Sequence, residues 1–168
     1  STASSLLQTT EGWITALRMT SLASRMNPDV EKKLASFKGE LHTLTDFLTE
    51  EILSGLSGEM QDLLLSTALL KNFCLDLVKA CYMKSETYPS EGMSIEELFD
   101  CLVNSDLFLV PLDDERKWFR YHNLFQKILI KQLDRRVDQE WIKSMQLAAA
   151  NWYEKEGLID EALDNLMM

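Results

Sequence analysis

The chain has 168 residues, a length that suits one ordinary domain or one domain with pieces of two neighbours. Hydrophobic residues make up 46% and charged residues 26%, which predicts a globular protein with a proper core and excludes disorder over most of the chain. The formal net charge of −10 repels a phosphate backbone and therefore disfavours nucleic-acid binding. No run of about 18 apolar residues occurs, so we expect no membrane span.

The three cysteines, Cys74, Cys81 and Cys101, are an odd number without CxxC spacing. This pattern argues against a disulfide framework and against a zinc site, and it favours a reducing, cytoplasmic environment. Each cysteine lies on an apolar helix face, where we expect simple core packing. The chain begins Ser1-Thr2-Ala3 without a secretory signal, so we expect a piece of a longer protein.

Apolar residues at helical spacing predict a mainly α-helical fold. The expected helices lie at about residues 10–24, 41–54, 57–67, 74–81, 95–102, 122–135, 139–156 and 159–168, with a linker or short helix at 27–40 and a loop at 83–93. Asn27-Pro28 is expected to end the first helix. Ser94 to Glu97 form a capping-box pattern, which predicts a helix start at that point.

The period of the apolar residues changes between Leu107 and Tyr121. A short apolar run over residues 107–112 is followed by a polar turn over 113–116 and by alternation over 117–121, which predicts a β-hairpin. Helices that enclose one short β-hairpin indicate a winged-helix domain. We expect this domain to be flanked by an N-terminal helix and by a C-terminal αα repeat unit.

No pattern typical of a catalytic centre is present. The sequence lacks GxxxxGK[ST], HExxH and GxSxG. Glu50-Glu51 and Glu96-Glu97 are adjacent in expected helices, where neighbours in sequence do not face each other, so we interpret them as solvated positions. We therefore predict no catalytic residue, no metal site and no cofactor within this chain.

His122 follows the expected hairpin directly and opens the next expected helix. A helix start offers free N–H groups and the positive end of a dipole, which suit a phosphate. Spacing alone favours the alternative of a capping or half-buried histidine. Lys127, Lys131, Arg135 and Arg136 then recur at helical spacing, and we interpret them as a solvated face rather than a DNA-contacting stripe.

Several segments, taken together and in order, resemble one family. They are residues 10–19 (TEGWITALRM), 47–53 (FLTEEIL), 63–70 (LLLSTALL), 107–114 (LFLVPLDD), 118–125 (WFRYHNLF), 148–154 (AAANWYE) and 157–163 (GLIDEAL). The chain is similar over nearly its whole length to the MalT-like, LuxR-type ATP-dependent transcriptional activators, which are signal-transduction ATPases with numerous domains. Members carry an ATPase, a winged helix, a superhelical sensor and a DNA-binding helix-turn-helix.

The resemblance implies three parts. Residues 1–40 would close the nucleotide-binding region and add a linker, residues 41–136 would form the winged helix, and residues 137–168 would be the first helical, TPR-like repeat unit. The implied function is regulatory: the module would couple the nucleotide state of the ATPase to the sensor. Its implied partners are the ATPase and sensor domains of the same polypeptide, and ATP or ADP would bind to the longer protein.

The resemblance also implies nucleotide-contacting residues. The segment from Tyr121 to Leu124 is similar to the Met-His-Asp segment of related ATPases, in which the histidine contacts the β-phosphate of ADP. Asn123 departs from that pattern, so only His122 is carried over. Gly12 and Trp13 occupy the place of a segment near the adenine, although the proline of that segment is missing here.

Two other functions stay open on the sequence. One is a helical-repeat interaction scaffold, and the other, which the acidic charge disfavours, is a DNA-binding winged helix. Repeat units need neighbours to bury their faces. We therefore expect uncovered apolar surface at Trp141, Met145, Trp152 and Leu163, and possible self-association through the C-terminal helices.

Overall fold

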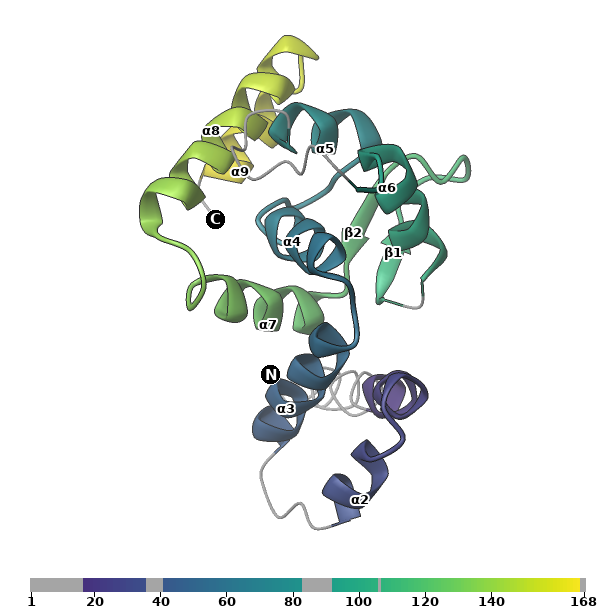
Figure 1. Cartoon of the computed structure of the whole chain (residues 1–168). Coiled ribbons are helices and arrows are strands. Elements are labelled where there is room, and N and C mark those ends of the chain that lie inside the picture. The colour runs from purple at the N-terminus through teal and green to yellow at the C-terminus, as the bar shows by residue number, and fades with distance from the viewer. Residues whose placement is uncertain (1–16, 36–40, 83–91, 106, 167–168) are drawn as a thin grey trace, which may run out of the picture. The chain divides into compact units, whose positions relative to one another are not determined.

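The computed structural model describes residues 17–35, 41–82, 92–105 and 107–166. The chain divides into two units, residues 1–61 (unit 1) and 62–168 (unit 2). The elements are α2 (Val30–Ala35), α3 (Leu41–Ser54), α4 (Gly58–Thr67), α5 (Leu75–Tyr82), α6 (Ile95–Asn104), β1 (Leu109–Pro111), β2 (Phe119–Tyr121), α7 (Asn123–Leu133), α8 (Gln139–Lys155) and α9 (Ile159–Leu166), labelled in Figure 1. The predicted fold class, mainly helical with one short hairpin, is confirmed.

Unit 1 is helical. Residues 17–26 are helical, and that helix ends before Asn27-Pro28 as predicted, because proline restricts the residue before it. The short helix α2 follows within the region expected to be a linker or short helix. Apolar side chains from these elements, from α3 and from the start of α4 are buried: Met19, Leu22, Ala23, Val30, Leu48, Ile52, Leu53 and Met60.

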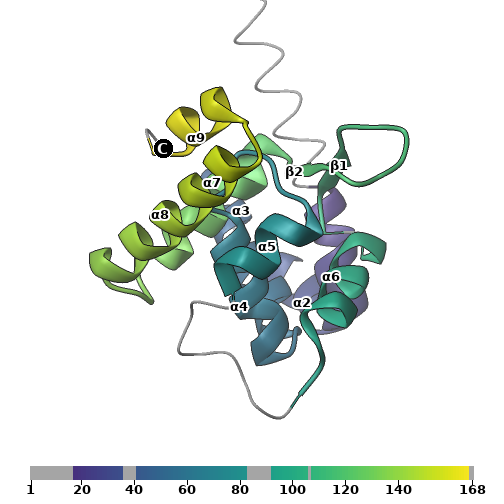
Figure 2. The same cartoon turned by 90° about the horizontal axis from the view of Figure 1, so that it is seen from above.

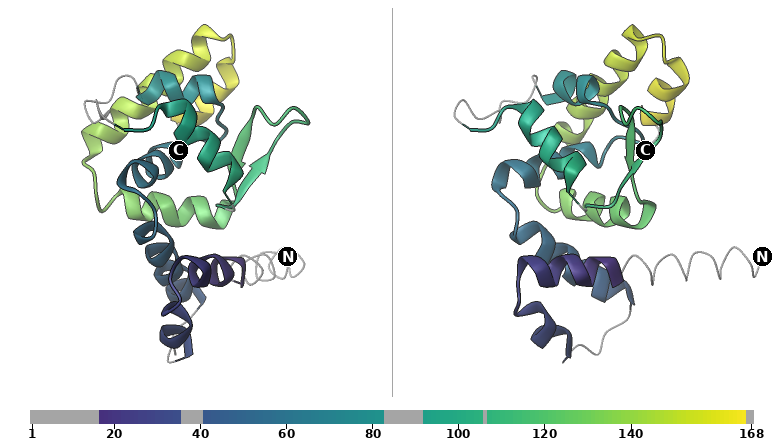
Figure 3. Two further views of the ribbon diagram at one scale, coloured as in Figure 1. Left: turned by 45° about the vertical axis from the view of Figure 1, so that its right-hand side comes forward. Right: turned by 90° about the vertical axis from the view of Figure 1, so that its right-hand side faces the viewer.

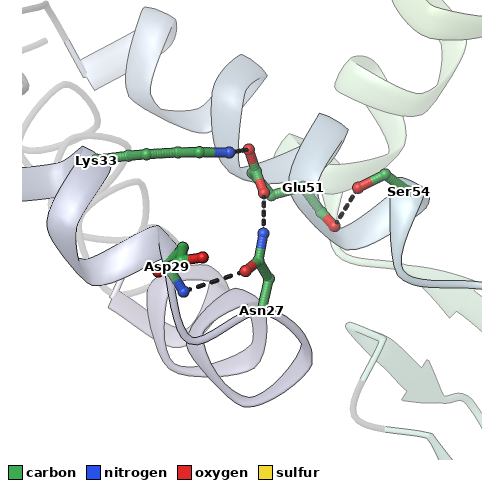
Figure 4. Close-up of polar contacts among 5 residues, drawn as sticks. All are labelled: Asn27, Asp29, Lys33, Glu51 and Ser54. Atoms are coloured by element: carbon green, nitrogen blue, oxygen red, sulfur yellow. Dashed lines mark hydrogen bonds and ion pairs between the residues drawn. The ribbon is translucent and has the colours of Figure 1, made fainter.

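A polar cluster of Asn27, Lys33 and Glu51 joins α2 and the residues before it to α3 (Figure 4). The Glu51 carboxylate accepts from Lys33 Nζ at 2.5 Å and from Asn27 Nδ2 at 2.9 Å. Asn27 Oδ1 in turn accepts from the backbone N–H of Asp29 at 3.1 Å. The hydrogen bond from Lys33 holds the pKa of Glu51 below its ordinary value of 4.5. This Glu51 cluster therefore fixes the turn between the first helix and α2 against α3.

Unit 2 has an aromatic core around the hairpin. β1 and β2 are antiparallel, with Leu109 opposite Tyr121 and Pro111 opposite Phe119. The hairpin stands out from the helices of this unit in Figures 2 and 3. Large side chains at its base are buried together: Phe73, Phe99, Phe108, Phe119, Tyr121 and Phe125. Burial alternates along β2, where Phe119 and Tyr121 face this core while Arg120 faces away from it.

The start of α6 agrees with the capping-box prediction. Ser94 Oγ accepts from Glu97 N at 3.2 Å, and the Glu97 carboxylate accepts from Ser94 N at 2.9 Å. The prediction that all cysteines pack in the core is wrong for Cys101, which is exposed. Cys101 lies three residues after Leu98, beside the stripe of buried residues on α6 but at its exposed edge.

The C-terminal helices α8 and α9 pack against each other as an αα-hairpin (Figure 3). Asp138 caps α8 by accepting from Trp141 N at 2.8 Å, and Gly157, with a φ of 76°, makes the turn before α9. Met145 is only 5% exposed, so its prediction as uncovered surface is wrong: it faces the same side as Ala148 and Ala149. Leu163 is 55% exposed, as expected.

Candidate functional site at the hairpin–helix junction

The chain passes directly from β2 into α7 at His122. His122 has an extended backbone, caps α7 by position, and makes no capping hydrogen bond through its side chain. Its backbone N–H donates to the carbonyl of Phe108 at 2.9 Å, and its carbonyl accepts from Gln126 N at 3.0 Å. Phe108 itself has a left-handed backbone, with a φ of 60°. His122 therefore opens the helix as predicted and is half-buried there, while its contact with a nucleotide stays a prediction.

Arg120 also contributes to this junction, and sequence reasoning missed it. Its guanidinium donates to the carbonyl of Tyr121 at 3.3 Å and to Asn123 Oδ1 at 3.4 Å. A cation thus lies beside the first turn of α7, where the free N–H groups already favour an anion. The sequence did contain a signal for Arg120. Side chains alternate along a strand, so a residue between two buried aromatic residues must face outward.

The hydroxyl of Tyr121 anchors β2 to α4. Tyr121 is fully buried, and its hydroxyl lies 2.7 Å from Thr67 Oγ1. The Thr67 hydroxyl lies 2.6 Å from the carbonyl of Leu63, which can only accept. We infer that Thr67 donates to Leu63 and accepts from Tyr121. Burial raises the pKa of Tyr121, so this hydroxyl keeps its proton and remains a donor.

Gln126, in the first turns of α7, anchors the helix to the chain after α4. Its side-chain amide donates to the carbonyl of Ala68 at 3.0 Å and to the carbonyl of Leu70 at 2.9 Å. Both carbonyls lie beyond the last residue of α4, where they have no helical donor. The helix that starts at His122 is therefore tied to the connection between α4 and α5.

The same connection also contacts β2 and α8. Phe73 and Phe119 exchange two backbone hydrogen bonds, of 2.8 and 2.9 Å, which extend the hairpin by an isolated bridge. The hydroxyl of Tyr153, in α8, donates to the carbonyl of Asn72 at 2.6 Å. Residues 68–73 thus accept hydrogen bonds from three elements that follow much later in the sequence.

The basic residues of α7 lie along a solvent-facing side of the helix and the turn that follows. Lys127, Arg135 and Arg136 are exposed and Lys131 is half-buried, which agrees with their interpretation as a solvated face. Within the described ranges, no three His, Cys, Asp or Glu side chains lie close enough to hold a metal ion. The other predicted nucleotide-contacting residues, Gly12 and Trp13, lie outside the described residues.

Comparison with known proteins identifies relatives over nearly the whole chain. The family model of the MalT winged helix domain matches residues 49–141. The chain is 26% identical over 162 residues to the serine/threonine-protein kinase PknK of Mycobacterium tuberculosis, which covers 96% of the chain and 14% of that protein. It is 29% identical over 156 residues to the HTH-type transcriptional regulator MalT of Vibrio parahaemolyticus, with 92% and 16% covered.

A second Vibrio relative gives the same result. The chain is 30% identical over 148 residues to the HTH-type transcriptional regulator MalT of Vibrio campbellii, which covers 87% of the chain and 16% of that protein. The chain therefore spans only 14 to 16% of the length of these relatives. Among the residues that the structure describes, no helix has the length and apolar character needed to cross a membrane.

Proposed function

The chain belongs to the family of the MalT winged helix domain, and from this premise we propose that it couples the nucleotide state of an ATPase to a helical sensor. The match over residues 49–141 makes it a regulatory module of the kind found in transcriptional regulators. In the proposed longer protein, its partners are the ATPase and sensor domains of the same polypeptide. The nucleotide is ATP or ADP.

The observation that carries this proposal is the position of His122. It lies at the start of α7, directly after β2, and the guanidinium of Arg120 contacts both of its neighbours in sequence. The first N–H groups of a helix and a nearby cation favour a phosphate. We propose that His122 contacts the β-phosphate of ADP in a closed, resting state, and that inducer and ATP favour an open state.

The size of the effect follows from one hydrogen bond. A hydrogen bond to a charged group contributes about 1.5–3 kcal/mol. If the bond exists only in the closed state, its loss shifts the balance between closed and open states by roughly ten- to a hundredfold. The His122→Ala substitution should therefore weaken ADP binding and raise transcription in the absence of inducer.

The test uses the natural polypeptide that contains this chain. ADP affinity, basal promoter activity and melting temperature are measured for His122→Ala and for His122→Gln, which retains an N–H donor. We expect a large loss of ADP affinity in the first variant and a smaller loss in the second, at unchanged melting temperature. Unchanged ADP affinity in a folded His122→Ala protein would assign His122 to packing and refute the nucleotide contact.

A second candidate function is a helical-repeat interaction scaffold. The observation in its favour is the apolar surface on α8 and α9, where Leu147, Ile159 and Leu163 are each more than half exposed. We propose that these side chains, called the C-terminal apolar face below, support self-association of the chain. Binding of DNA is not proposed, because the net charge of −10 opposes it.

A further inference from the structure

We infer that residues 68–73, which join α4 to α5, form a rigid link that makes α8 move together with the junction of β2 and α7. The inference rests on the proposed function, because it supplies the route by which a change at His122 would reach the C-terminal helices. It concerns unit 2 alone and needs no nucleotide to be tested.

One end of this 68–73 link is held by α7. The amide of Gln126 donates to the carbonyls of Ala68 and Leu70, only four residues after His122 in the sequence. Tyr121, on the other side of His122, is bonded to Thr67 immediately before the link. A displacement of His122 must therefore either displace the start of the link or break these bonds.

The other end of the link is held by α8 and β2. The Tyr153 hydroxyl donates to the carbonyl of Asn72 at 2.6 Å, and Phe73 is paired with Phe119 through two backbone bonds. A ring contact adds to this attachment, since the centroids of Trp118 and Trp152 lie 6.1 Å apart in an edge-on arrangement. The hairpin and α8 are thus both attached to the last two residues of the link, Asn72 and Phe73.

The attachment of α8 through the 68–73 link differs in burial from its direct covalent connection to α7. Phe73, Phe119 and Tyr153 are at most 1% exposed, and hydrogen bonds in such surroundings are stronger than those in water. The direct connection from α7 to α8, residues 134–138, is exposed at all positions except the half-buried Val137. The link itself is buried at Ala68, Leu69, Leu70 and Phe73, half-buried at Asn72 and exposed only at Lys71. It is therefore better covered than the exposed turn and constrains α8 more than that turn does.

The experiment measures hydrogen exchange of backbone amides in the 168-residue chain without nucleotide. Tyr153→Phe removes one hydroxyl, and Gln126→Met removes two bonds from a residue of α7. The loss of a hydrogen bond should speed exchange of the affected amides by about three- to tenfold. We expect Gln126→Met to speed exchange in α8, and Tyr153→Phe to speed exchange at Phe119 and His122, because coupling is reciprocal.

The matched control is Ser94→Ala, which removes the cap of α6 in the same unit without touching the link. The loss of this cap should destabilise the unit to a similar degree, so the variant reports the effect of general destabilisation. Faster exchange in α8 for Gln126→Met than for Ser94→Ala supports the rigid link. Equal exchange in α8 for these two variants would overturn it, and so would a folded Tyr153→Phe protein with unchanged exchange at Phe119 and His122. Neither result depends on ADP, so failure here is distinct from failure of the nucleotide contact.

Discussion

At the scale of single residues, buried and half-buried side-chain hydrogen bonds join segments of unit 2 that are far apart in the sequence. The bonded atoms of Thr67 and Tyr121 belong to residues 54 positions apart in the sequence, and those of Gln126 and Ala68 to residues 58 positions apart. A hydrogen bond between buried groups matters mainly because leaving one partner unsatisfied is costly. The direction of each bond therefore decides which substitution is harmful.

We predict that Thr67→Val destabilises the chain more than Tyr121→Phe does. Thr67→Val leaves the Tyr121 O–H donor buried without the hydroxyl that accepts its hydrogen bond, which costs about 1–3 kcal/mol. Tyr121→Phe removes that donor, while Thr67 still donates to the carbonyl of Leu63, so the cost is about 1 kcal/mol. Chemical denaturation of both variants measures the difference. A larger loss in Tyr121→Phe would reverse the donor assignment.

Sequence reasoning could place His122 but could not find its support. Its position follows from a local signal, the change from strand to helix period, and the structure has α7 start at the next residue. Tyr121, Gln126 and Tyr153 look in the sequence like ordinary core or surface residues. Their roles depend on partners that only the tertiary fold brings near them. These are the Thr67 hydroxyl for Tyr121 and the carbonyls of Ala68 and Asn72 for Gln126 and Tyr153.

At the scale of elements, local patterns predict most of the fold. Period and capping correctly indicate α6, α7, α8 and the hairpin, because these segments carry their own apolar face or turn. The assignment of Cys101 to the core failed because an apolar side chain near a helix stripe need not lie on it. Expected helical residues before Leu17 lie outside the described residues.

The packing of α2 with α3 depends on charge as well as apolar burial. The side chain of Glu51 is 13% exposed, whereas Lys33, its ion-pair partner, is half exposed. The lowered pKa of Glu51 means that the folded state binds its proton less tightly than the unfolded state does. The resulting stability is present above the unfolded pKa, near 4.5, and is lost as the pH falls through the folded pKa.

We predict that Glu51→Gln lowers the free energy of unfolding at pH 7 by up to about 1 kcal/mol, because half-exposed ion pairs contribute little more. The difference from the unsubstituted chain should shrink as the pH falls from 7 to below the ordinary value of 4.5, through the lowered pKa of Glu51. Denaturant titrations across this range measure it. The matched control is Asp29→Asn, which breaks the exposed ion pair with Lys32 in the same unit and should change less. A difference that does not depend on pH would contradict the ionic role of Glu51.

At the scale of the whole molecule, the C-terminal apolar face is the surface that we assign to association. Leu147, Ile159 and Leu163 are 57%, 53% and 55% exposed. Only Leu163 was expected from the sequence. Residues 147 and 159 were missed because a pattern of apolar residues does not show which side of an αα-hairpin its partner helix covers.

We predict that the chain self-associates at high concentration and that the triple substitution Leu147→Gln, Ile159→Gln and Leu163→Gln weakens association at least tenfold. The reason is that burying one such side chain contributes about 1.5–3 kcal/mol. Sedimentation velocity over a concentration series measures the change. Leu112→Gln, at an exposed leucine after β1, serves as the control and should leave association unchanged. A monomeric chain at every concentration would exclude a scaffold role for this face.

The left-handed backbone at Phe108 limits which amino acids that position can accept. Glycine would relieve the strain at a φ of 60°, about 1–2 kcal/mol. It would also remove a buried ring whose centroid lies 5.0 Å from that of Phe125, and truncating such a ring costs about 3–5 kcal/mol. A β-branched residue would add strain without replacing the ring. Most single substitutions at position 108 should therefore be destabilising. A random mutant library of this chain would contain few folded variants at this position, although its place in a loop suggests that it is freely variable.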